Sequence, residues 1–174
     1  MVAIVAAVTV GACAKKQPPP EPVQTPPPTT PTPTQQRPSM PVEDPNAAAA
    51  AAAKRNTLQQ VVNFDYDRSD ITAQAATILQ AKLPVLREDP SIRLRIEGHA
   101  DERGSIEYNL ALGMRRAQAV KNYLAGYQLE AGRFQTESFG EERPRVQGSN
   151  EAAWAQNRRA EFVIVAGSII NMDR

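Results

Sequence analysis

Residues 92–116 read IRLRIEGHADERGSIEYNLALGMRR, and this stretch decides the fold. Apolar and charged residues alternate over 92–97, which predicts a strand with one face in the core and the other in water. A short polar loop follows, and from Glu107 the apolar residues take up helical spacing. The stretch therefore predicts a strand, a loop and a helix in succession, and it brings an acid, Asp101, within range of a base, Arg116.

A helix is expected over residues 107–125. Asn109, Leu112 and Arg116 cluster on a strip about 90° round from its core stripe. We therefore expect Arg116 at the rim where the helix meets the loop, neither in the core nor freely solvated. The core stripe contains small residues, which allow the helix to lie close to a sheet, and it consists of Leu110, Gly113, Ala117, Val120 and Leu124.

Further strands and helices alternate on both sides of this stretch. Pro84 lies inside a helical pattern and is expected to kink or break its helix. The order β-α-β-α-β-α-β predicts a single α/β (α+β) sandwich, in which helices cover one face of a mixed four-stranded sheet. The other expected strands span residues 61–66, 134–139 and 159–165, and the other expected helices span 71–86 and 151–156.

The chain begins with a segment that is typical of export. Residues 1–10 are apolar, have the length of a signal-peptide core, and are too short to span a bilayer. Val10–Cys13 (VGAC) resembles a bacterial lipobox, so we interpret residues 1–12 as a lipoprotein signal peptide and Cys13 as the lipidated residue. The alternative is a chance cysteine near a processed terminus. If the lipobox is genuine, Ala14 after the cysteine implies sorting to the outer membrane, where several acyl chains would anchor the protein stably.

Residues 13–56 are expected to form a disordered, lipid-anchored tether. Twelve of the fifteen prolines fall between Pro18 and Pro45, which blocks both helix and sheet. The alanine run that follows has no second apolar face, so it is expected to form at most a transient helix that does not dock strongly. Residues 57–166 are then the folded domain, and residues 167–174 a loose tail.

Composition excludes several classes of function. The chain has 20 Lys and Arg against 19 Asp and Glu, a net charge of +1, so no field of one sign points to nucleic acid. One cysteine and one histidine, His99, rule out an intramolecular disulfide and the usual Cys/His zinc clusters, and any metal would have to rely on carboxylates. His99, Asp101 and Glu102 form no complete catalytic set, so we expect neither an enzyme nor a cofactor.

Two interpretations of Asp101 and Arg116 remain. In the first, Asp101 or Ser105 caps the helix and Arg116 pairs with a neighbouring acid, as in many surface loops. In the second, which we favour, they form a pocket for a small zwitterion. A guanidinium holds a carboxylate with two hydrogen bonds, and a nearby carboxylate holds an ammonium group.

Several segments of the chain closely resemble the peptidoglycan-associated lipoproteins of the OmpA-like C-terminal domain family. They are GHADERGSIEYNLALGMRRAQAV (98–120), YLAG (123–126), SFGEERP (138–144) and NEAAWAQNRRAEF (150–162). The resemblance covers roughly residues 61–165. It implies non-covalent binding to the diaminopimelate of peptidoglycan, attachment to the outer membrane facing the periplasm, and membership of the Tol-Pal system, with the propeller protein TolB as partner and roles in envelope integrity and cell division.

The same resemblance implies a set of ligand-binding residues. Arg158 and Arg159 match a family motif, and a direct ligand role and a structural role both stay open for them. Ala100 and Pro84 depart from the family pattern, and Pro84 puts the continuity of its helix in doubt rather than the site. The peptidoglycan-binding residues that the resemblance implies are Asp101, Arg116, Tyr66, Asp67, Asn109 and Leu112.

The resemblance leaves two alternatives to wall binding. The first is a peptidoglycan hydrolase or amidase, which would release soluble fragments of the wall. The second is a module that chiefly binds other periplasmic proteins.

Overall fold

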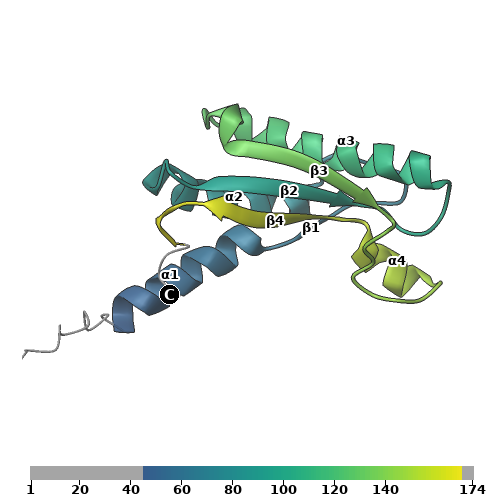
Figure 1. The fold of residues 1–174 in the computed structure, drawn as a ribbon, viewed down its shortest axis with the longest axis horizontal. Coiled ribbons are helices and arrows are strands. Elements are labelled where there is room, and N and C mark those ends of the chain that lie inside the picture. Colours follow the sequence, from purple (N-terminus) through teal and green to yellow (C-terminus); the bar gives the residue numbers. More distant parts are fainter. Residues whose placement is uncertain (1–44, 170–174) are drawn as a thin grey trace, which may run out of the picture. The chain divides into compact units, whose positions relative to one another are not determined.

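The computed structural model describes residues 45–169 (Figure 1). Cys13 and the proline-rich segment, for which a lipid anchor and a tether are predicted, lie outside the described residues. No helix in the described part is long and apolar enough to cross a membrane. The elements are α1 (Pro45–Gln59), β1 (Val62–Asn63), α2 (Ala73–Glu88), β2 (Arg93–His99), α3 (Ile106–Ala125), the 3-10 turn η1 (Ala131–Arg133), β3 (Phe134–Gly140), α4 (Glu151–Asn157) and β4 (Arg159–Ala166).

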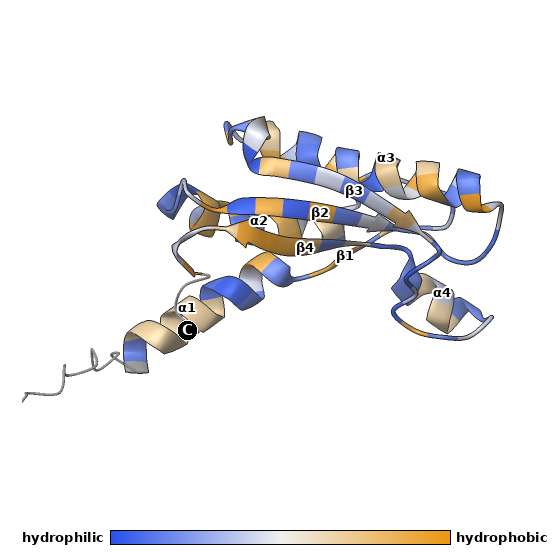
Figure 2. Cartoon of the chain, in the orientation of Figure 1, coloured by the Kyte–Doolittle hydropathy of each residue, from blue (hydrophilic) through white to orange (hydrophobic). Residues whose placement is uncertain are grey.

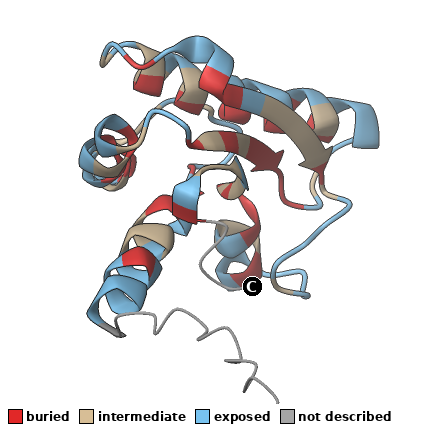
Figure 3. Ribbon diagram, turned by 60° about the vertical axis from the view of Figure 1, so that its left-hand side comes forward, coloured by how far each residue is buried: buried red, intermediate tan, exposed pale blue. Residues whose placement is uncertain are grey.

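The four strands form one mixed sheet in the order β1-β4-β2-β3. β2 runs parallel to β3 and antiparallel to β4, and β1 pairs with β4 in antiparallel orientation. Helices α2 and α3 lie on the same face of this sheet (Figures 1 and 3). The predicted mixed four-stranded sheet with helices on one face is confirmed.

The core lies between the sheet and these helices. Apolar and polar residues alternate along β2 (Figure 2), and Leu94 and Ile96 are fully buried on its helix side. Leu79 of α2 and Val120 of α3 pack into the same cluster, together with Phe162 of β4. This confirms the predicted apolar faces of the strand and of both helices. Because the core side of α3 is fixed in this way, the orientation of its other sides is fixed as well.

Two glycines let α3 approach β2 closely. A Cβ atom on Gly98 would lie 1.8 Å from the backbone oxygen of Gly113, and one on Gly113 would lie 2.4 Å from the Ser138 hydroxyl oxygen. Neither position can take a side chain unless the helix moves away from the sheet. The close packing that the small residues of the stripe predict is therefore present.

Helix α1 docks on the domain, which differs from the transient helix expected for the alanine run. Leu58, near its end, is fully buried in the core, and Ala51 is buried beside it. The Lys82 ammonium group of α2 donates hydrogen bonds of 2.9, 2.9 and 2.7 Å to the backbone oxygens of Thr57, Leu58 and Gln60. The docking uses Ala51 inside the alanine run as well as residues beyond it, so the folded unit begins before residue 57.

Helix α2 continues through Pro84 to Glu88, so the expected break is wrong. Proline removes one hydrogen bond of the helix, but Leu86 in the last turn is fully buried. Arg133 also donates hydrogen bonds to the backbone oxygens of Leu86 and Asp89, at 2.9 Å each. Tertiary packing and these bonds to the end of the helix outweigh the local cost of the proline.

Two smaller expectations also fail. The first residues of the predicted tail are held, because Ser168 donates its hydroxyl to Asp89 at 2.6 Å and Ile169 is buried. The second face of β2 is not uniformly wet, because Glu97 and His99 are buried there.

Candidate functional site

A pocket of about 280 Å³ opens where three segments meet, namely the chain after β1, the loop after β2 and one side of α3. All six site residues predicted from the sequence line it, so the structure brings them together. Three further residues line it that the sequence analysis did not assign to the site. The lining residues are Tyr66, Asp67, Asp101, Arg103, Gly104, Tyr108, Asn109, Leu112 and Arg116.

The loop of the pocket is shaped by the start of α3. Ser105 caps the helix by accepting a hydrogen bond of 3.2 Å from the Tyr108 backbone N–H. Asn109 donates its side-chain amide to the backbone oxygens of Asp101 and Arg103, at 3.1 and 3.2 Å. Asn109 thus fixes the loop that carries Asp101, and Ser105, rather than Asp101, is the cap.

Arg116 forms the buried floor of the pocket. Its guanidinium donates hydrogen bonds to three backbone oxygens, those of Arg68 (2.8 Å), His99 (2.7 Å) and Asp65 (3.1 Å). The residue is 0% exposed, so the expected rim position is wrong. Burial lowers the pKa of Arg116 to about 10, although the charge of Asp101 acts in the opposite direction. The group therefore stays cationic at neutral pH, and the three bonds use three of its five N–H donors.

Asp101 is also buried, and two arginines hold its carboxylate. Arg103 donates from its backbone N–H (3.1 Å), from Nε (3.2 Å) and from Nη2 (2.6 Å), and Arg158 donates from Nη1 at 3.3 Å. Burial alone would raise the pKa of Asp101, but these bonds and the charge of Arg103 hold the pKa below its ordinary value. Asp101 is therefore ionised, and among the described residues its direct partners are Arg103 and Arg158 rather than Arg116.

Asp67 presents a more accessible carboxylate at the mouth of the pocket. It is exposed and adopts a positive φ of 54°, which turns the chain after β1. The Tyr108 hydroxyl donates a hydrogen bond to its Oδ1, and this bond raises the pKa of Tyr108. No ion pair to Asp67 occurs among the described residues, so its charge stays available to a ligand.

One wall of the pocket is a stacked arrangement around Arg103. The guanidinium carbon of Arg103 lies 4.0 Å from the ring centre of Tyr66 and 4.1 Å from that of Trp154. Arg103 is thus held between two aromatic rings while it pairs with Asp101. This packing orders Tyr66 although its side chain is largely exposed.

Arg158 and Arg159 take different positions, and neither lines the pocket. Arg158 donates to the backbone oxygen of Phe64 (3.1 Å) and bridges Asp101 to Glu151. Arg159 pairs instead with Glu161 on the same strand, at 2.6 Å. Arg158 therefore positions Asp101 from behind, and Arg159 belongs to the face of the sheet that carries Glu161.

The sequence analysis missed Arg103, Gly104 and Tyr108. Tyr108 stands one helical turn before Leu112, so the helical spacing that grouped Asn109, Leu112 and Arg116 could have included it. Arg103 and Gly104 lie in a loop, where no periodicity indicates which way a side chain points.

Comparison with known proteins places this fold and site in a family. The OmpA family matches residues 63–158. The peptidoglycan-associated lipoprotein of Haemophilus influenzae is 50% identical over 106 residues, which cover 59% of this chain and 69% of that protein. The crystal structure of the peptidoglycan-associated lipoprotein from Burkholderia pseudomallei is similar with a TM-score of 0.59 and 38% identity, over 72% of this chain and 99% of that one. The C-terminal domain of Helicobacter pylori MotB shares the fold at 15% identity, with a TM-score of 0.58 over 65% of this chain and 93% of that one. The chain therefore belongs to the OmpA family, together with the peptidoglycan-associated lipoproteins that it resembles.

Proposed function

We propose that this protein binds peptidoglycan non-covalently through diaminopimelate and links the outer membrane to the cell wall. The observation that carries the proposal is a single pocket lined by Arg116, Asp67 and Asp101. Diaminopimelate in a stem peptide offers a carboxylate and an ammonium group on one short side chain, which such a pocket complements. The names of the relatives at 44 to 50% identity support wall association.

The charged residues of the pocket differ in whether another side chain already pairs with them, and this decides which of them can bind the ligand. Arg103 and Asp101 neutralise each other, so neither is the stronger partner for a ligand. Arg116 donates only to backbone oxygens among the described residues, and its positive charge attracts the ligand carboxylate. Asp67, which has no ion pair among the described residues, attracts the ammonium group. The proposal therefore gives Asp67 a larger role in binding the ammonium group of the ligand than the sequence alone suggested.

Binding without catalysis agrees with the pocket better than hydrolysis does. Its lining includes no serine, cysteine or histidine that could act as nucleophile or general base. Its arginines and Asp101 are held by hydrogen bonds that favour their charged forms, which suits recognition of a charged ligand. We therefore propose a binding protein rather than a wall hydrolase or amidase.

The test is co-sedimentation of the purified protein with sacculi that contain diaminopimelate. Asp67→Asn is expected to weaken binding about tenfold or more, because it removes a charged hydrogen-bond acceptor from an exposed position that the fold does not need. Asp70→Asn is the matched control, since Asp70 is exposed on the same segment and pairs only with Arg68 among the described residues. Asp101→Asn is expected to abolish binding, because it also releases Arg103 and Arg158.

Competition with free amino acids checks which part of the ligand is recognised. Diaminopimelate should displace the protein from sacculi, and lysine should not, because lysine lacks the second carboxylate that Arg116 is proposed to hold. Unchanged sedimentation of both aspartate variants would contradict the site. Release of soluble fragments from the sacculi would favour a hydrolase instead.

The proposal extends to the anchor and to the partner. Acylation of Cys13 would place the protein in the outer membrane facing the periplasm, and Cys13→Ser should then leave it in the soluble periplasmic fraction. Membership of the Tol-Pal system predicts capture of TolB by the purified domain. Competition between TolB and peptidoglycan fragments would indicate that both use the pocket surface.

A further inference from the structure

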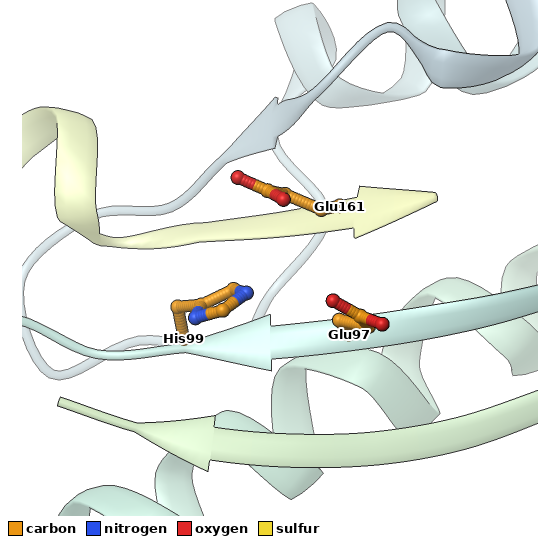
Figure 4. Close-up of side chains that lie close together, drawn as sticks. All are labelled: Glu97, His99 and Glu161. Atoms are coloured by element: carbon orange, nitrogen blue, oxygen red, sulfur yellow. The ribbon is translucent and has the colours of Figure 1, made fainter. Parts of the chain in front are cut away.

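The face of the sheet opposite α2 and α3 carries a second cluster of polar side chains (Figure 4). Glu97 of β2 and Glu161 of β4 are direct cross-strand partners, and His99 follows two residues after Glu97 on the same face. One ligand atom from each of the three residues lies within 4.8 Å of the others. The cluster is distinct from the pocket, because none of the three lines it.

His99 is the unusual member of this cluster. Its side chain is almost completely buried, yet neither ring nitrogen has a hydrogen-bond partner within the described residues. Buried polar atoms are nearly always paired, so an imidazole with two unpaired nitrogens needs an explanation. Burial, assisted by the charge of Arg159, lowers the pKa of His99 to about 4. Because neither nitrogen is engaged in a hydrogen bond within the described residues, one of them can offer its lone pair to a cation.

The ring of His99 is held in a fixed orientation. It stacks on Phe139, with ring centres 5.6 Å apart and an interplanar angle of 25°. Arg143 packs on the ring of Phe139, with its guanidinium carbon 3.6 Å from the ring centre. With the ring held in this way, one of its nitrogens lies on the side of the two carboxylates (Figure 4).

The two carboxylates also have spare capacity. Like charges directly opposite each other destabilise an antiparallel pair of strands unless a cation lies between them. Arg95 donates to Oε1 of Glu97 at 2.8 Å, and Arg159 donates to Oε1 of Glu161 at 2.6 Å. Among the described residues, no hydrogen bond reaches Oε2 of either group. One oxygen of each carboxylate is thus free to bind a cation.

We propose that Glu97, His99 and Glu161 bind one divalent transition-metal ion, with Zn²⁺ as the best candidate. A neutral imidazole with two carboxylates is a donor set that zinc accepts, with water completing the tetrahedron. Calcium and magnesium prefer oxygen ligands alone, so the histidine disfavours them. Ligand atoms around one zinc ion stand about 3.4 Å apart, so the three side chains need to close by at most about 1.4 Å.

The positive charges of nearby arginines repel a metal ion at this site, but the two arginines that pair with the glutamates have other acceptors. Arg95 is partly exposed and has another acceptor in Glu137, at 3.2 Å, so it can leave Glu97 without losing a partner. Arg159 also donates to the backbone oxygens of Asn157 and Arg143, at 3.3 and 3.1 Å, which hold it when Glu161 turns to the metal. The charge of Arg143 also acts on His99, and the charge of Arg145 acts on Glu161.

Calorimetric titration of metal-free protein with zinc chloride tests this site. The protein is the full chain without a histidine tag, and Cys13→Ser removes the thiol that would compete. We expect one Zn²⁺ per chain, with affinity reduced about tenfold or more in His99→Gln and in Glu161→Gln. Glu107→Gln, an exposed carboxylate on α3, should bind like the parent chain. Magnesium and calcium should not compete at equal concentration.

Nuclear magnetic resonance reports on the ligand directly, because His99 is the only histidine of the chain. Zinc should shift its two ring-carbon proton signals together with the calorimetric binding curve. Absence of binding, or binding that leaves these signals unchanged, would overturn the proposal. Because His99 is buried, His99→Gln could lose its fold; the more exposed Glu161→Gln then decides, and wild-type affinity in that variant would also overturn the proposal.

Discussion

Arg116 and Lys82 are two buried cations that the chain uses in different ways. Each is 0% exposed, and each donates hydrogen bonds to three backbone oxygens rather than to a carboxylate. Arg116 joins β2 to the segment after β1 and also lines the pocket. Lys82 fastens the end of α1 to α2 and lies over the ring of Phe162 at 4.2 Å, away from the pocket lining. The first cation serves both fold and binding, and the second serves the fold alone.

The chemistry of the two side chains explains the assignment. Burial lowers the pKa of Arg116 to about 10 and that of Lys82 to about 7. A guanidinium spreads five donors over a plane, so it can bind three oxygens and still face a ligand, whereas an ammonium has three donors in all. Near neutral pH Arg116 is therefore fully charged, whereas Lys82 is only partly charged.

The largest effect is expected for Arg116→Met. The backbone oxygens of Asp65, Arg68 and His99 lose their donor, and the free energy of unfolding should fall by about 3–6 kcal/mol. Wall binding should be lost as well. Denaturant unfolding measures the first effect, and sacculus co-sedimentation below the unfolding transition measures the second. Arg115→Met, next to it on the exposed side of α3, should change stability by less than about 0.5 kcal/mol.

Leu58→Ala tests the opposite case, a loss of stability without a loss of binding. Leu58 is fully buried where α1 docks, so the free energy of unfolding should fall by roughly 2–5 kcal/mol. Sacculus binding of the folded fraction should stay at the parent level, because the pocket does not include α1. Gln59→Ala, exposed on the next residue, is the control. Weakened binding in Leu58→Ala would mean that α1 and the pocket are coupled.

The smallest effect is expected in the pH dependence of stability, which Lys82 should influence and Arg116 should not. The folded-state pKa of Lys82, about 7, lies below its ordinary value of 10.5. Between these values the unfolded chain holds a proton at this site that the folded chain has released, so stability should rise with pH, by at most about 1.4 kcal/mol per unit. Unfolding at pH 7, 8 and 9 measures the slope, which Lys82→Met should remove. Wall binding should stay constant over this range because Arg116 remains charged; a flat stability profile in the parent chain would contradict the assignment for Lys82.

Regular periodicity made most of the fold predictable. The alternation around Ile96 defined β2, and the 3-4 spacing through Ala117 defined α3 and its approach to the sheet. Two predictions, the break of α2 at Pro84 and the undocked alanine helix, were wrong for the same reason. Each structure depends on a residue that is distant in the sequence. Helix α2 passes Pro84 because Arg133 holds its end, and α1 docks because Lys82 donates to its last turn and Leu58 packs into the core.

Six of the nine residues that line the candidate site were predictable, but their contacts were not. The helical wheel grouped Asn109, Leu112 and Arg116, and the family resemblance added Tyr66 and Asp67. Neither could show that the partners of Arg116 are backbone oxygens, because the direction of a carbonyl group leaves no mark on the side-chain pattern. For the same reason the pairing of Asp101 with Arg103 and Arg158 became visible only in three dimensions.

The docking of α1 has a mechanical consequence if the protein links two layers of the envelope. A pull on the chain ahead of residue 45 would reach α1 before it reaches the pocket. The fifteen residues of α1 span about 22 Å as a helix and about 50 Å when extended, so peeling it would lengthen the molecule by roughly 30 Å. Leu58 and Lys82 would set the force at which this slack is released, while the segment with Asp67, beyond β1, stays folded around the ligand.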